Sequence, residues 1–136
     1  MIQVIAGIKG SGKTKRLIDL TNATAREAVH DVIFLDDDNR YMYDVDHKVR
    51  FINARDYHVK NTDMFIGFLG GILSSNYDVG TIFVDAFLKL CHTDLAGSEP
   101  VVATLAELGA KHNVDFVLSV SADPEDLPAF LKQYVI

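Results

Sequence analysis

The residue pattern with the clearest chemical meaning lies near the start of the chain and fits G-x-x-x-x-G-K-S/T: Gly7, Ile8, Lys9, Gly10, Ser11, Gly12, Lys13 and Thr14. Its glycines let the backbone take left-handed angles and approach a ligand closely. Successive N–H groups can then surround anionic oxygens. Lys13 can reach the terminal phosphates of a nucleotide, and Thr14 can place a hydroxyl on a magnesium ion. Together with Lys15, these residues form the predicted binding site for a nucleotide and Mg²⁺.

Such a loop needs a strand before it and a helix after it, and the sequence supplies both. Residues 2–6 form an apolar run that is typical of a short buried strand. A helix is predicted from about 13 to 29, with one face made of Leu17, Ile18, Thr21, Ala25, Ala28 and Val29. The N-terminus of this helix adds partial positive charge at the loop.

Two further apolar runs end in acidic residues. Residues 81–84 precede Asp85, and residues 32–35 precede a segment of three aspartates at 36–38. Both runs are typical of buried parallel strands, and ligands of open α/β sheets bind at the carboxyl ends of the strands. We therefore expect Asp85, at the tip of its strand, to face the phosphate-binding loop.

The acidic segment 36–38 has two interpretations. Attack on a phosphate needs a group that orients or deprotonates the nucleophile, and this segment is the only acidic cluster expected to face the loop. The alternative is a solvated acidic turn. Ser119 or Ser121, in a later apolar run, either senses the terminal phosphate or packs in the core. The predicted catalytic residues are Lys13, Asp36 and Asp38.

The remaining segments complete a series of βα units. Residues 40–52 are either a hairpin or a loop that leads into a strand at 49–52. In that segment Tyr41 and Tyr43 either pack or stack on a base. Further elements are predicted in the order helix at 62–75, helix from 98, strand at 116–121 and helix from 123. The predicted fold is a three-layer α/β/α architecture with a mostly parallel five-stranded sheet.

Length and composition narrow the class of protein. The 136 residues suit one domain, predicted to span 1–136. The net charge of −6 argues against a general nucleic-acid or membrane-surface binder. The longest apolar run, 64–73, is shorter than the ~20 residues that a bilayer needs, and a strand that starts at residue 2 leaves no room for a signal peptide. We expect a cytoplasmic protein without membrane or nucleic-acid partners.

The glycine-rich loop resembles the Walker A motif of the P-loop NTPases, and residues 81–85 are similar to a Walker B segment. The second resemblance implies that Asp85 holds the magnesium ion through water. Residues 35–41 and 108–114 resemble segments of the thymidine-kinase branch of RecA-like P-loop proteins. This resemblance implies a RecA-like core. The chain departs from that branch twice, because Ala86 follows Asp85 where the branch has glutamate, and because Cys91 alone cannot supply its zinc-bound cysteine lasso.

Three functions remain open at this point. The favoured one is a slow Mg-dependent ATPase that acts as a switch or assembly factor; the others are a small-molecule kinase of the nucleoside type and a nucleotide-binding module without turnover. ATP is the expected nucleotide, because the Asn-Lys-x-Asp segment of guanine-specific proteins is absent. No arginine follows Arg55, so Arg40, Arg50 or Arg55 would stabilise the transferred phosphate in cis or from a neighbouring subunit of a homo-oligomer.

Overall fold

In the computed structural model, which describes residues 1–136, the chain forms a five-stranded parallel sheet with the strand order β1-β5-β4-β2-β3. The strands are β1 (Ile2–Gly7), β2 (Asp31–Asp36), β3 (Arg50–Asn53), β4 (Val79–Val84) and β5 (Asp115–Ser121). The long helices are α1 (Lys13–Glu27), α2 (Thr62–Ser75) and α4 (Glu99–His112). The short helices are α3 (Phe87–Leu90), α5 (Ala129–Lys132) and the 3-10 turns η1 (Ala54–Tyr57), η2 (Ala96–Ser98) and η3 (Pro124–Asp126).

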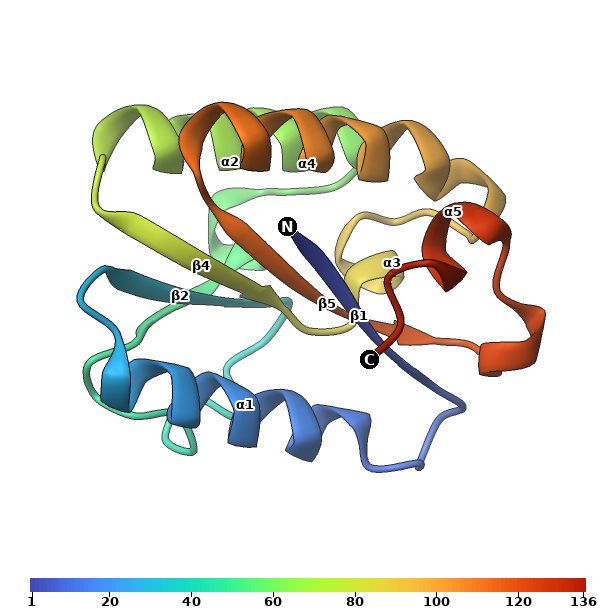
Figure 1. Ribbon diagram of the computed structural model, residues 1–136, viewed down its shortest axis with the longest axis horizontal. Helices are drawn as coiled ribbons and strands as arrows, with labels where there is room; N and C mark the ends of the chain where they lie inside the picture. The colour runs from blue at the N-terminus through green and yellow to red at the C-terminus, as the bar shows by residue number, and fades with distance from the viewer.

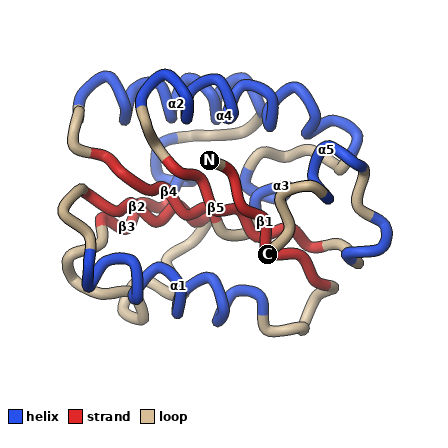
Figure 2. Tube along the Cα trace, in the orientation of Figure 1, coloured by secondary structure: helices blue, strands red, loops and turns tan.

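The sheet lies between two layers of helices, with α1 on one face and α2 and α4 on the other (Figures 1 and 2). Successive side chains of a strand point to opposite faces, so each central strand contributes to two cores. In β2, Val32 and Phe34 join the core beneath α1, whereas Ile33 and Leu35 join the larger core on the other face. The predicted three-layer α/β/α fold with a mostly parallel five-stranded sheet is confirmed, and all of its strand pairs are parallel.

The strand order determines which residues meet at the carboxyl edge of the sheet. Strand β5 lies between β1, which carries the glycine-rich loop, and β4, which ends just before Asp85. The register pairs Ile5 with Ser119 and Val84 with Leu118. Because these strands are parallel, the glycine-rich loop, the end of β5 and the end of β4 come together at one edge.

Local sequence signals explain where the long helices begin and end. The Asn61 side chain accepts the Met64 N–H at 2.8 Å, as a helix cap does, and α2 begins there as predicted. Helix α1 ends at Glu27, because Ala28 takes an extended backbone conformation. The prediction of a helix to Val29 was therefore wrong at its end, and Val29 is 92% exposed.

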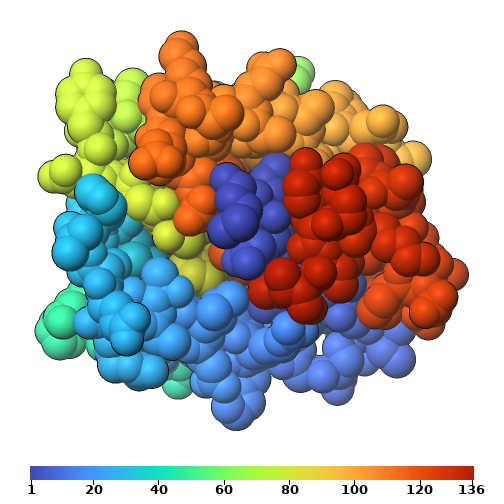
Figure 3. Space-filling view, viewed as in Figure 1, coloured from blue at the N-terminus to red at the C-terminus, as the bar shows by residue number.

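The structure also differs from the sequence prediction in two other segments. Residues 40–49 form a loop, and the strand that follows pairs parallel with β2, so the hairpin alternative was wrong. The single helix predicted from 123 was wrong, because the chain forms the 3-10 turn η3, an extended Leu127 and then the one-turn helix α5. After α5 the chain runs beside β1. The Val4 N–H donates to the Tyr134 carbonyl at 2.8 Å, and the two ends of the chain lie side by side at the surface (Figure 3). None of the helices has the length and apolar character needed to cross a bilayer.

Candidate functional site

The loop between β1 and α1 has the backbone of a phosphate cradle. Gly10 and Gly12 have φ angles of 86° and 85°, in the left-handed region that favours glycine. At Gly7 the chain makes a close approach instead, because a Cβ there would meet the Ser11 hydroxyl, which would have to turn away. The Ser11 N–H donates to the Ile8 carbonyl at 3.1 Å and closes the turn. The loop then leads directly into α1, whose first N–H groups have no partner within the helix and suit an anion.

A cavity of about 740 Å³, here called the P-loop cavity, opens beside this loop. Its lining comes from the loop, from α1 and from the segment after β2: Lys9, Gly10, Gly12, Lys13, Thr14, Lys15, Ile18, Asp19, Asn22, Arg40, Tyr41 and Asp44. Asn22 fixes the far wall, since its side chain donates to the Asp44 carbonyl at 3.0 Å and accepts the Asp46 N–H at 2.7 Å. The cavity has the size of a small-molecule site.

The two tyrosines of the 40–49 loop have different positions. Tyr41 is half buried, lines the P-loop cavity and packs against the core beneath α1. The Arg40 guanidinium carbon lies 5.7 Å from the centre of the Tyr41 ring. Tyr43 is 90% exposed and lines no part of the cavity. Tyr41 can therefore both pack against the core and contact a ligand in the cavity. Tyr43 does neither.

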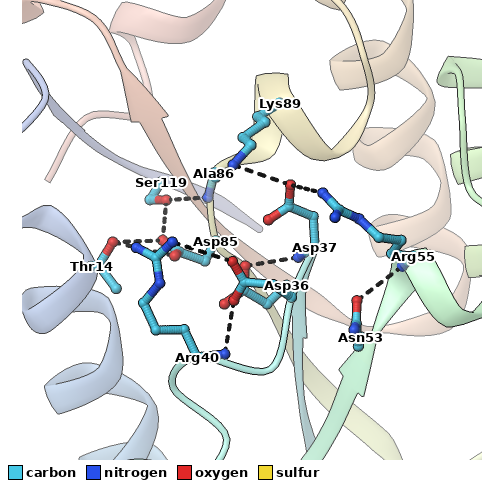
Figure 4. A network of polar contacts seen from close by, with 11 residues as sticks. Thr14, Asp36, Asp37, Arg40, Asn53, Arg55, Asp85, Ala86, Lys89 and Ser119 are labelled. Carbon is cyan, nitrogen blue, oxygen red and sulfur yellow. Dashed lines mark hydrogen bonds and ion pairs between the residues drawn. The ribbon is translucent and has the colours of Figure 1, made fainter.

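A polar network links the loop to the end of β4 (Figure 4). The Thr14 hydroxyl donates to the Asp85 carboxylate, with distances of 3.2 and 3.3 Å to its two oxygens. The Ser119 hydroxyl donates to the same carboxylate at 2.6 Å and accepts the Ala86 N–H at 2.7 Å. Ser119 therefore orients Asp85. Ala86 has a left-handed φ of 49°, and its methyl group offers no acid or base.

Asp36 is one of two buried acids of the site, together with Asp85. Its side chain is only 3% exposed and, at the end of β2, it follows the alternation of Phe34 onto the face covered by α1. One oxygen accepts the Asp37 N–H at 2.8 Å, while the other, Oδ2, has no hydrogen-bond partner. Burial raises the pKa of Asp36 from 3.8 to about 7, an effect that the hydrogen bond from Asp37 opposes and the neighbouring carboxylate of Asp85 reinforces.

The other two aspartates of the acidic segment are paired with cations, and Figure 4 shows the pairs of Asp37 with Arg55 and Lys89. Asp38 accepts the backbone N–H of Arg40 at 2.8 Å, and its second oxygen lies 3.6 Å from the Arg40 guanidinium. Asp37 lies 3.6 Å from the Arg55 guanidinium and 3.5 Å from the Lys89 ammonium. Of the three, only Asp36 has a buried oxygen without a partner. The catalytic role of Asp38 stays a prediction, and its carboxylate is already occupied by Arg40.

The same architecture is found in the crystal structure of a KaiC-like protein from the hyperthermophilic archaeon Pyrococcus horikoshii. The match has a TM-score of 0.69 and 14% sequence identity, and it covers 98% of this chain and 68% of the other. The protein has a KaiC-like, RecA-type fold. No protein-family model and no curated protein matches the sequence. The likeness establishes the fold, while the chemistry of the site rests on its own geometry.

In this KaiC-like fold, the residues present fit a magnesium-bound nucleotide. Lys9, Lys13 and Lys15 all line the P-loop cavity, although the chain as a whole carries a net charge of −6. Thr14 and Asp85 provide the hydroxyl and carboxylate oxygens that magnesium prefers. These residues would hold the phosphates and the metal, respectively.

The three arginines proposed for the reaction lie in different places. Arg40 lines the P-loop cavity, and Arg55 is engaged with Asp37. Arg50 begins β3 and is exposed, so it lies at the amino edge of the parallel sheet, opposite the loop. Within one subunit, Arg40 is the arginine that reaches the cavity.

The sequence did not single out Asn22 or Lys89. Asn22 interrupts the apolar face of α1, and an asparagine inside a helix is a signal for a hydrogen bond made elsewhere. Lys89 gave no signal, because its direction depends on the left-handed turn at Ala86 that starts α3.

Proposed function

We propose that the protein binds ATP with magnesium in the P-loop cavity and hydrolyses it slowly, as a switch or an assembly factor. The observation that carries the proposal is the contact of Thr14 with Asp85, 3.2 Å at its shorter distance, beside a loop with two left-handed glycines. In this contact the two predicted magnesium ligands, the Thr14 hydroxyl and the Asp85 carboxylate, lie next to each other. A glycine-rich turn that binds no ligand, with a lysine there by chance, would have no need of this contact.

Each residue of the site has a separate task. Lys13 binds phosphate oxygens by charge-assisted hydrogen bonds, and Thr14 and Asp85 hold the metal. Bound Mg–ATP supplies the reactive phosphate and part of the charge neutralisation. Asp36 takes the proton that a water molecule loses as it attacks, because a carboxylate with a pKa of about 7 is suited to a general base near neutral pH.

The rate is expected to be low. Position 86 holds alanine and not an acid, so the base comes from the acidic segment 36–38, and only Arg40 among the arginines lines the cavity. An arginine that stabilises the transferred phosphate is worth ~10³-fold or more in rate. A subunit that lacks a well-placed one turns over slowly.

The test is phosphate release from ATP over hours at high protein concentration, with and without magnesium. We expect magnesium-dependent release by the wild-type protein and none by Lys13→Ala. Equal release by both proteins would show a contaminating enzyme and refute the assignment. Binding without any release would make the protein a nucleotide-binding module.

A second candidate function is phosphoryl transfer to a small molecule of the nucleoside type. One observation favours it, because a second cavity with Asp37 in its lining opens beside the acidic segment. Labelled ATP incubated with a panel of nucleosides separates the two: a labelled nucleoside product supports the kinase, and labelled free phosphate alone supports the ATPase.

A further inference from the structure

The second cavity has a volume of about 390 Å³ and is here called the Arg55 cavity. Its apolar lining consists of Ala54, Val59 and Leu90, which are buried members of the core beneath α2 and α4. The P-loop cavity lies on the α1 side, so the two cavities open on opposite faces of the sheet. Polar and charged residues complete the Arg55 cavity: Asp37, Arg55, His58, Lys60 and His92.

The charges around the Arg55 cavity do not balance. Asp37 is the only carboxylate in its lining, and it already faces two cations, Arg55 at 3.6 Å and Lys89 at 3.5 Å. Lys60 adds a third cation and has no carboxylate within 4.0 Å. A surplus of positive charge above an apolar floor suits a ligand with an anionic group and a small apolar body. This local positive charge contrasts with the net charge of −6 of the whole chain.

Two left-handed residues fix the rim of the cavity. His58 has a φ of 61°, and its N–H donates to the Arg55 carbonyl at 3.1 Å. His92 has a φ of 53°, and its N–H donates to the Lys89 carbonyl at 3.1 Å. Each histidine thus closes a short turn, and each turn carries one of the two cations that pair with Asp37, Arg55 or Lys89. The rim is built from fixed backbone turns and not from free side chains alone.

We propose that the Arg55 cavity binds a small ligand through an oxyanion group, phosphate or carboxylate, which contacts Arg55 and Lys60 and competes with Asp37 for Arg55. The proposal rests on the proposed function in one respect, because it adds a second ligand, in a separate cavity, next to the segment that carries the candidate base Asp36. The Arg55 cavity is linked to the candidate base by a short path, because the Asp37 N–H donates to the Asp36 carboxylate at 2.8 Å. A ligand that displaces the Asp37 carboxylate acts one residue away from the candidate base.

The histidines of the chain allow a direct test. Proton NMR of the imidazole resonances is followed while the full nucleotide-free chain is titrated, at constant pH and ionic strength, with inorganic phosphate and, separately, with acetate. His58 and His92 line the Arg55 cavity, whereas His30, His47 and His112 line neither this cavity nor the P-loop cavity. We expect a saturable shift confined to His58 and His92 in at least one of the two titrations.

Variants locate the bound anion. Arg55→Met should weaken the apparent affinity about tenfold or more, the effect of losing one charge-assisted contact. Arg50→Met, which removes the same charge at the opposite edge of the sheet, should leave it unchanged. If Arg55→Met does not fold, Lys60→Met, at an exposed position of the rim, provides the same test.

Three results would overturn the proposal: no saturable shift at His58 and His92 with either anion, an equal shift of all five histidines, or an unchanged affinity in the rim variants. The titration is repeated with Lys13→Ala, where the shifts should persist. Their loss would mean that the anion binds the P-loop, and would overturn the proposal too. Because the assay contains no nucleotide, its failure is distinct from a failure to bind ATP.

Discussion

The Thr14 hydroxyl lies 3.2 and 3.3 Å from the two carboxylate oxygens of Asp85, although 71 positions separate these residues in the chain. Thr14 is at the start of α1 and Asp85 directly follows β4, and β5 lies between the two parent strands. Ser119, near the end of β5, holds Asp85 with a hydrogen bond of 2.6 Å. The strand between them therefore supplies the group that orients the carboxylate.

Asp85→Asn should weaken magnesium-dependent ATP binding about tenfold or more and change magnesium-free binding little. The amide keeps the shape of the side chain but loses the negative charge that a hard cation requires. The measurement is ATP titration with magnesium and with a chelator. Asp44→Asn is the matched control, because Asp44 lines the same cavity without contacting Thr14. An equal loss with and without the metal would make Asp85 a structural residue.

Asp36→Asn should lower the rate of phosphate release about 10²-fold or more while ATP affinity stays within about threefold, because a general base contributes to the rate and not to ground-state binding. Single-turnover phosphate release and ATP titration give the two quantities. Asp38→Asn is measured in parallel, since Asp38 is paired with Arg40. A larger rate loss in Asp38→Asn than in Asp36→Asn would assign the base to Asp38.

The raised pKa of Asp36 predicts how stability depends on pH in the absence of nucleotide and metal. The unfolded carboxyl group loses its proton near 3.8, whereas the folded one keeps it to about 7. Between these values the folded protein binds more protons, so the free energy of unfolding falls as the pH rises. The difference in pKa corresponds to at most about 4 kcal/mol.

Urea denaturation at several pH values between 4 and 8 measures this effect. Asp36→Asn should gain stability relative to the wild type as the pH rises through this range, and the gain should level off above pH 7. Glu107→Gln, an exposed change on α4, should follow the wild type. A constant difference between Asp36→Asn and the wild type would show that Asp36 titrates alike in the folded and unfolded states.

Much of this site could be predicted from the sequence because its signals are local. The glycine pattern determines the loop, and the apolar runs that end in Asp36 and Asp85 place both acids at the carboxyl edge of the sheet. Which acid is buried could not be predicted in this way. Asp36, Asp37 and Asp38 are identical and adjacent, and they differ only in the faces and cations that the tertiary fold brings to them.

The Arg55 cavity was also beyond prediction from the sequence. It depends on η1 after β3 and on α3 after β4, two short turns that pattern analysis could not place against each other. The left-handed conformations of His58, Ala86 and His92 fix those turns. Alanine carries no sequence signal for this conformation, and histidine, although enriched in it among residues other than glycine, adopts it too rarely for a prediction.

Turnover should rise faster than linearly with protein concentration if a neighbouring subunit supplies an arginine. The reason is that Arg40 alone lines the cavity in one subunit, and an arginine in trans is worth ~10³-fold or more. Specific activity is measured across a wide dilution series, beside mixtures of Lys13→Ala with variants of Arg40, Arg50 or Arg55. Constant specific activity on dilution to a proven monomer would rule out such a composite site.

The central claim, that the glycine-rich loop binds the phosphates of a nucleotide, is tested most directly by titrating Mg–ATP into the wild-type protein and into Lys13→Ala. Lys111→Ala, which removes an exposed lysine from α4, is the charge-matched control, and thermal melting checks that all three proteins are folded. We predict that Lys13→Ala loses affinity about tenfold or more with an unchanged melting temperature, while Lys111→Ala binds like the wild type. Unchanged affinity in a folded Lys13→Ala protein would contradict the account.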